Sequence, residues 1–334
     1  MPLGLALLRF IYPRRLVGQA IAWNALVVAG ASAAGPAVGA GILSIASWPW
    51  LFAVNLPVGA LVLAACAGLP RTPLSARRID LWSIALNAGL FAAFVLGADA
   101  LASQPLEGGA LLAMSAVCLV LLVRREMPQA APLIPLDLLR GHSFRMSVIA
   151  SVCCFAGQMA SSVALPFYIH HELGQSAVTT GLLMMPWPLA TMLAAPLSGR
   201  LAERVPTAWL CAAGGACLAA GLLLCAAWPV HGDPRLPLAA FTALAGLGFG
   251  FFQTPNNQNM LLAAPKERSG AAGGAQGVAR LTGQTLGSLL MGLLFAWLPS
   301  HRATHGGLVL AALLALAGAL ASLLRSPTRS AVAA

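Results

Sequence analysis

The sequence predicts an all-α integral membrane protein, and three observations carry this prediction. First, 59% of the residues are apolar and only 8% are charged, whereas soluble domains are roughly a quarter charged and under half apolar. Second, the chain divides into apolar runs long enough to cross a bilayer, which takes about 20 residues. Third, basic residues gather in alternate loops between these runs, as they do in multi-pass membrane proteins.

We expect about ten transmembrane helices, the fourth of which extends back to residue 104. Their approximate bounds are 18–42, 51–69, 80–101, 109–123, 146–169, 178–198, 207–228, 236–258, 271–298 and 306–324. Residues 1–12 offer too few apolar side chains to span a bilayer. We expect this segment to be the end of a helix whose beginning is absent from the sequence.

The loops between the spans differ in charge. Of the nineteen Lys and Arg residues, sixteen lie in one set of alternating loops, Arg235 and Arg302 lie in the other set, and Arg280 lies inside a span. Because basic loops face the cytoplasm, we expect a cytoplasmic C-terminus. The net charge of +10 therefore reflects topology. Aromatic residues do not interleave the basic ones as in a stacking platform, so the expected partner is the lipid bilayer and not nucleic acid.

Residues 124–145 form a long, proline-rich and charged loop between four spans and six spans. Its position and composition predict a cytoplasmic linker between two helix bundles. Within it, residues 136–139 form a short amphipathic segment that we expect at the membrane surface.

The first complete span, within residues 13–41, is rich in small residues over its second half and contains Pro36. Small residues let membrane helices approach closely, and proline removes one backbone hydrogen bond. We therefore expect a bent, tightly packed membrane helix.

An internal repeat relates this helix to residues 265–293, at an offset of 252 residues. Both copies have a basic entry, one amide a few turns in, and glycines beyond it. The matched pairs are Pro13 with Pro265, Gly18 with Gly270, Asn24 with Gln276, and Gly35 with Gly287. A parallel repeat of this kind is typical of secondary transporters whose two halves rock about a central site.

Three motifs now carry a family resemblance. Gly35, Pro36 and Gly39, with Gly30 before them, resemble the antiporter motif of the major facilitator superfamily, although Ala31 and Ala40 replace two of its glycines. Residues 199–204, GRLAER, resemble the superfamily's G-x-L-A-D-R loop, with Glu203 in place of Asp. Residues 246–270 resemble two later helices of the 14-helix drug:proton antiporter branch (EmrB-like multidrug efflux).

This resemblance implies a major facilitator fold of which the ten spans are helices five to fourteen, so that the chain is N-terminally truncated. It divides the chain into a remnant of the N-terminal bundle (1–69), an extra central helix pair (70–123), the linker (124–145) and a C-terminal six-helix bundle (146–334). In the intact family, small molecules would be exported across the bacterial inner membrane by alternating access. The proton gradient would drive export without a cofactor, and a periplasmic adaptor or outer-membrane channel would be a partner.

A transporter needs polar groups at mid-membrane, where unpaired ones are costly and persist for packing or for function. The candidates for the substrate cavity are Asn24, Gln158, Ser161, Gln253, Gln276, Arg280 and Gln284. Interhelical bonding is the alternative for Gln158, and snorkelling to the cytoplasm is the alternative for Arg280. Asn256, Asn257 and Asn259 are interpreted as helix-capping or gate residues, and Asp80 and Asp99 as caps. The antiporter-motif packing residues are Gly30, Gly35, Pro36 and Gly39, and the cytoplasmic gate residues are Gly199, Arg200, Glu203 and Arg204.

Other functional classes find less support. The seven cysteines lie inside apolar runs without a C-x-x-C pair, and the six histidines show no metal-binding spacing. No clustered His, Asp or Ser/His pair indicates an enzyme or a metal site. No acidic residue lies at mid-span in the second half, so the sequence identifies no proton relay. The alternative to a transporter is a truncated, non-transporting membrane remnant or a scaffold subunit.

Overall fold

The structure is a computed structural model that describes residues 7–8, 11–68, 80–127, 136–202, 204–228, 235–265 and 268–325. Throughout these residues every regular element is a helix, and the predicted all-α class is confirmed. Eight of the described helical segments have the length and apolar composition to cross a membrane.

The first two predicted spans correspond to α2 (Arg14–Ile45) and to the short pair α3 (Trp50–Ala53) and α4 (Asn55–Cys66). The next two form a hairpin of α5 (Leu81–Ser103) and α6 (Pro105–Glu126). Beyond the linker, the spans are α8 (His142–Phe167) continued by the π-helical turn η1 (Tyr168–Glu172), α9 (Ala177–Met184) with α10 (Pro186–Leu201), α11 (Thr207–Ala227), α12 (Arg235–Ala263), α13 (Ser269–Trp297) and α14 (Ser300–Leu323). The short segment expected in the linker is α7 (Leu136–Leu139).

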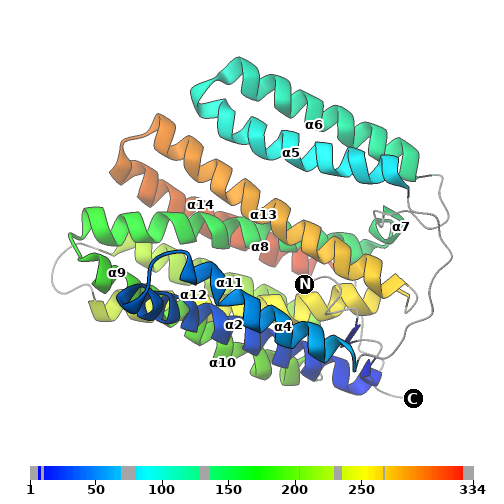
Figure 1. The fold of residues 1–334 in the computed structure, drawn as a ribbon, viewed down its shortest axis with the longest axis horizontal. Coiled ribbons are helices and arrows are strands. Elements are labelled where there is room, and N and C mark those ends of the chain that lie inside the picture. Colours follow the sequence, from blue (N-terminus) through cyan, green and yellow to red (C-terminus); the bar gives the residue numbers. More distant parts are fainter. Residues whose placement is uncertain are drawn as a thin grey trace.

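Six of these helices form a bundle in which each packs on at least one neighbour along much of its length. Helix α8 lies between α13 and α14, α11 lies between α12 and α14, and α12 also packs on α10. Figure 1 shows this bundle with α2 along α10 on one side and the α5–α6 hairpin beside α13 on the other. The largest core cluster lies inside the bundle, around Phe155, Leu218, Leu222 and Phe249.

Glycines set the distances between the helices. A Cβ atom on Gly214 of α11 would lie only 2.5 Å from the Phe252 backbone nitrogen of α12. On the other side of the bundle, a Cβ on Gly283 of α13 would lie 2.6 Å from the Val152 carbonyl oxygen of α8. Because lipid tails are as apolar as the side chains, such close backbone approach is a main source of helix association in a membrane.

Hydroxyl groups add bonds across the same contacts. Thr191 of α10 donates to the Gly246 carbonyl of α12 at 2.9 Å. Thr242 of α12 donates to the Leu183 carbonyl of α9 at 3.1 Å. Such bonds between membrane helices contribute roughly 0.6–2 kcal/mol each, so close packing and polar bonding act together on α12.

Helix α2 docks on α10 through its first half. A Cβ on Gly199 of α10 would meet the Ala22 Cβ of α2 at 2.7 Å and the Gly18 carbonyl oxygen at 3.3 Å. Further along α2, Gly30 has the Met192 sulfur as its nearest neighbour, 3.5 Å from an added Cβ. We call this contact, formed by Gly18, Ala22 and Gly30 of α2 with Met192 and Gly199 of α10, the α2–α10 seam.

The second half of α2 differs from the expectation of tight packing. The helix continues without interruption to Ile45. Among the described residues, however, nothing lies within 4 Å of a Cβ added to Gly35, and Gly39 meets only the Leu51 side chain at 3.8 Å. The partner helix α10 begins at Pro186, less than two turns before Met192, which is the residue next to Gly30. Little of α10 is therefore left to contact the part of α2 that follows Gly30.

The α5–α6 hairpin has its own close contact and ion pair. A Cβ on Gly108 of α6 would lie 2.6 Å from the Leu101 nitrogen of α5. Asp80 caps α5 by accepting from the Trp82 and Ser83 amides, as expected for this residue. Its carboxylate also pairs with Arg125 of α6 at 2.9 Å. The Arg125 guanidinium holds the pKa of Asp80 well below its usual range. The expectation that Asp99 caps the other end is wrong, because α5 continues to Ser103 and Asp99 lies inside it as an exposed residue.

Replacing Gly214 with Ala should destabilise the bundle, because the new methyl group has no room between α11 and α12. Gly→Ala inside a helix ordinarily stabilises by about 0.5–1 kcal/mol, whereas an overpacked contact costs about 1–3 kcal/mol. We expect a lower thermal unfolding midpoint for G214A in detergent. The matched control is G292A on α13, where nothing lies within 4 Å of an added Cβ. Equal midpoints for the two variants would contradict the close crossing.

Candidate functional site

Three of the predicted cavity residues form one line on α13. Gln276, Arg280 and Gln284 are spaced four residues apart, so they share a face of the helix. Gln276 is 6% exposed, and Arg280 and Gln284 are half-buried. The Gln276 side-chain nitrogen is buried and has no hydrogen-bond partner among the described residues. We call this line of three side chains the α13 polar stripe.

The stripe borders the contact between α13 and α8. Gly283 and Gly287, which lie three and seven residues after Arg280 on the same side of α13, pack on Val152 and Ala156 of α8. The glycines bring the two backbones together and thereby leave the longer Gln284 and Arg280 side chains at the margin of the contact. Close packing therefore fixes where the polar side chains lie.

The two candidates on α8 have different surroundings. Gln158 is half-buried and donates to the Ser162 hydroxyl one turn on, at 3.0 Å. Ser161 is fully buried and donates to the Gln158 carbonyl at 2.8 Å. It shares a face with Gly157 and Ala164, both of which pack on α14. The structure therefore places Ser161 in a helix contact, away from the α13 polar stripe.

Gln253 is half-buried on α12. It continues the face that carries Gly246 and Gly250, both of which pack on α10. It therefore lies on the side of α12 that faces α10. This position does not bring Gln253 to the α13 polar stripe.

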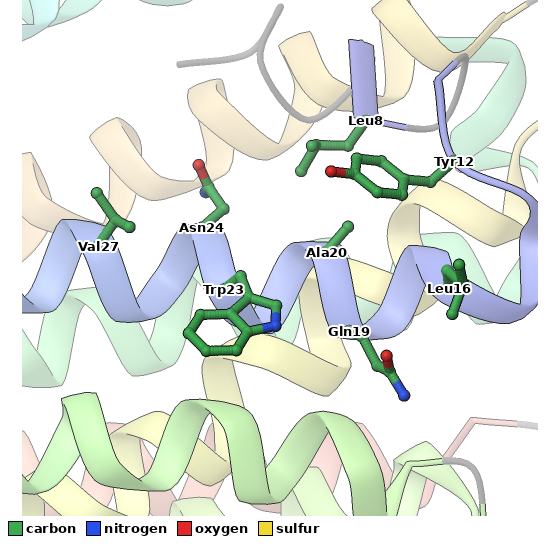
Figure 2. Close-up of a pocket in the computed structure, with 8 residues that line it drawn as sticks. All are labelled: Leu8, Tyr12, Leu16, Gln19, Ala20, Trp23, Asn24 and Val27. Carbon is green, nitrogen blue, oxygen red and sulfur yellow. The ribbon is translucent and has the colours of Figure 1, made fainter.

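Asn24 lies in a groove along the first half of α2. The groove has a volume of about 460 Å³ and is lined by Leu8, Tyr12, Leu16, Gln19, Ala20, Trp23, Asn24 and Val27. Figure 2 shows Asn24 on the same side of α2 as Tyr12, whereas Trp23 points to the other side. Asn24 is exposed, so its amide is accessible from this groove.

The predicted gate loop lies at the α2–α10 seam. Gly199 packs directly on α2, and the basic side chains Arg200 and Arg204 are exposed. Glu203 lies outside the described residues, so its expected pairing with these arginines stays a prediction. Gly199 thus joins α10 to the front part of the chain.

A polar network missed by the sequence analysis lies at the same end of the bundle. Asn256 of α12 donates to the Ser151 hydroxyl of α8 at 2.6 Å, and Asn259 donates to the Ser147 hydroxyl at 2.7 Å. Arg325, just past α14, donates to the Asn256 side-chain oxygen. Arg325 is 4% exposed, and no carboxylate in the described part of the chain contacts it.

This network corrects the interpretation of the asparagines as helix caps. Helix α12 continues to Ala263, so Asn256 and Asn259 lie inside it and bond to α8. A signal existed in the sequence, because residues 253–259 (QTPNNQN) are densely polar within an apolar span. The role of Arg325 could not be anticipated, since its burial depends on three helices at once.

An apolar cluster next to the network joins the linker and α2 to the bundle. It contains Val17 and Ile21 of α2 together with Phe144, Met260, Leu261, Ala264 and Ala272, with Leu138 and Leu139 of α7 packed against it. Asp137 of α7 pairs with Arg268, at the start of α13, at 2.7 Å. The front part, the linker and the bundle thus share one core at the end where the basic loops lie.

The family model described as "Major Facilitator Superfamily" matches residues 1–285 and 147–334. The chain belongs to this superfamily. It is therefore a multi-pass membrane protein, as the resemblance of its motifs implied.

Several curated proteins are similar to this chain. An "Uncharacterized transporter YebQ" of Escherichia coli (strain K12) is 43% identical over 85% of this chain and 63% of its own length. "Riboflavin transporter RibZ" of Clostridioides difficile (strain 630) is 28% identical over 82% and 60%, respectively. A "Multidrug resistance protein B homolog" of Mycobacterium tuberculosis (strain ATCC 25618 / H37Rv) is 27% identical over 76% and 48%. The chain thus spans about half to under two thirds of these relatives.

Replacing Asn256 with Leu should destabilise the protein, because it leaves the buried Arg325 and Ser151 without their shared amide partner. A buried polar group left unpaired costs about 1–3 kcal/mol. The matched control is N257L, which removes an amide whose oxygen has no partner among the described residues. We expect N256L to unfold at the lower temperature in detergent. If N257L is the less stable variant, the network does not hold the helices together.

Proposed function

We propose that this superfamily member acts in the proton-coupled export of small organic molecules by alternating access. The observation that supports it best is the α13 polar stripe. It places a buried, unpartnered amide nitrogen of Gln276 beside two half-buried polar side chains in a membrane-spanning helix. Such groups are costly in a membrane and mark substrate or ion pathways. Relatives named for riboflavin transport and multidrug resistance agree with a small-molecule substrate.

The substrate site would lie along this stripe and the Asn24 groove. Asn24 of α2 and Gln276 of α13 are the matched amides of the internal repeat. Residues 1–69 would belong to one bundle, 70–123 to an extra helix pair, 124–145 to the linker and 146–334 to the second bundle. Rocking about the seam would then expose the site to either side of the membrane.

The finer assignments follow the resemblance of the motifs. We place the protein in the 14-helix drug:proton antiporter branch, with its C-terminus in the cytoplasm of a bacterium and the proton gradient as its energy source. A periplasmic adaptor or outer-membrane channel would be a partner of the whole assembly.

A second candidate is a non-transporting membrane subunit. The open second half of α2 favours it, because nothing described lies within 4 Å of a Cβ on Gly35. In this role the glycine-rich half of α2 would bind another membrane helix. The experiment below separates the two candidates.

Replacing Arg280 with Gln, or Gln276 with Leu, should reduce the initial rate of transport about tenfold, which corresponds to about 1.4 kcal/mol of lost binding. The rate would be measured as riboflavin or ethidium movement in proteoliposomes with an imposed pH gradient. The control is T282V, which is nearly isosteric and lies on a different face of α13. Unchanged rates in both stripe variants would refute the site. A wild-type protein that moves neither compound, with or without the gradient, would favour the subunit.

A further inference from the structure

Three helical segments meet at a cluster of polar side chains at the end of the bundle opposite the basic loops. Glu172 is the last residue of η1, Thr304 and His305 lie near the start of α14, and Ala226 lies near the end of α11. The His305 Nε2 atom lies 3.1 Å from the Glu172 Oε2 atom. Thr304 donates its hydroxyl to the other Glu172 oxygen. The two side chains of this pair are partly buried, with exposed fractions of 18% for Glu172 and 39% for His305.

The donors and acceptors of this cluster require an additional proton. The His305 Nδ1 atom lies 3.0 Å from the Ala226 backbone carbonyl oxygen, which can only accept. A neutral imidazole carries one N–H group. If Nδ1 donates to Ala226, the Nε2 lone pair faces the lone pairs of the Glu172 carboxylate. The contact becomes a hydrogen bond only when a further proton lies between Nε2 and Oε2.

Among the described residues, no other titratable side chain bonds to Glu172 or His305. The Tyr168 ring makes a T-shaped contact with the His305 ring at 5.1 Å, and its buried hydroxyl has no hydrogen-bond partner among the described residues. Near this end of the bundle, the other titratable side chains that the structure describes are His170, His171, Cys225, Arg235, His301 and Arg302. The His170 and His171 rings make a T-shaped contact with each other, and His170 bonds to the Gln175 carbonyl.

Two features make the segment from Pro166 to Glu172 easier to deform than a regular α-helix. Pro166 lies inside α8 and cannot donate to the helix ladder. The chain then adopts a π-helical turn from Tyr168 to Glu172, a form that is uncommon and recurs at functional sites. The Glu172 carboxylate ties the free end of this turn to α14 and, through His305, to α11.

The structure assigns a proton-binding site to Glu172 and His305. When the proton is bound, this pair clasps α14 to the end of α8 that lies opposite the basic loops. Uptake of a proton from water turns the Nε2–Oε2 contact into a charge-assisted bond, which is stronger than a neutral one. Loss of the proton to water leaves one N–H group for two acceptors. With that N–H on Nδ1 and donating to Ala226, Nε2 and Oε2 are two acceptors facing each other, and the π-helical turn is released. The clasp is closed at low pH and open at high pH. This assignment does not depend on which molecule, if any, the protein transports.

The test is a double-mutant cycle on the full chain in detergent micelles. The variants are E172Q, H305F and the double variant, in which Phe retains a ring against Tyr168. Histidine changes charge between about pH 5 and pH 8. We expect the two substitutions to be coupled at pH 5.5, by a thermal-midpoint shift of about 2–4 °C for a bond of about 1 kcal/mol. At pH 8 the coupling should disappear.

The control cycle pairs E172Q with H301Q, which lies one turn from His305 on α14 and should show no coupling at either pH. Coupling of equal size at pH 5.5 and pH 8, or none at either, would overturn the proposal. If a variant fails to fold, hydrogen exchange of wild-type residues 167–173 decides the question. With labelling times scaled for the intrinsic pH dependence, protection should be lost at pH 8. Equal protection at both pH values would also overturn the proposal.

Discussion

Close approach of helix backbones is the constraint on which the rest of this structure depends. In water, burial of apolar surface would hold helices together, but in lipid that driving force is largely absent. The bundle relies instead on positions where a side chain would not fit. Gly214 and Gly248 face each other between α11 and α12, Gly246 and Gly250 face α10, and Gly283 and Gly287 face α8. The α10–α12 crossing also brings a carbonyl group within reach of a hydroxyl on the next helix, as for Thr191 and Gly246.

The same constraint positions the polar side chains. On α13 the glycines and the polar stripe lie on the same side of the helix, so the register that packs Gly283 on Val152 also determines where Arg280 and Gln284 lie. On α2, Gly18 and Ala22 pack on Gly199, and Asn24 remains accessible in its groove. A site made this way is precise because it follows from backbone contacts, which are stiffer than contacts between long side chains.

The fold class could be predicted from the sequence because apolar run length and basic-loop alternation are local properties. The sites depended on contacts between distant residues. Gln276 and Arg280 could be anticipated from polarity within a span. The sequence could not show that Ser161 lies in a packed helix contact whereas Gln158 is only half-buried. The two residues are three positions apart on α8, and which of them faces a neighbour depends on how the helix is rotated. Asn256 was expected to cap a helix and instead bonds to Ser151 and Arg325, since no local signal showed that α12 continues to Ala263.

The two polar clusters lie at opposite ends of one helix pair, and their effects combine. Helices α8 and α14 pack together through Gly157 with Ala311 and Ala164 with Gly307. At the basic end, Asn256 links α8 to Arg325, directly after α14. At the other end, the Glu172–His305 pair links the same two helices. The first link contains no titratable carboxylate among the described residues, whereas the second depends on a proton. A change in pH would therefore free one end of α8 and leave the other fixed, which confines any movement to the segment beyond Pro166.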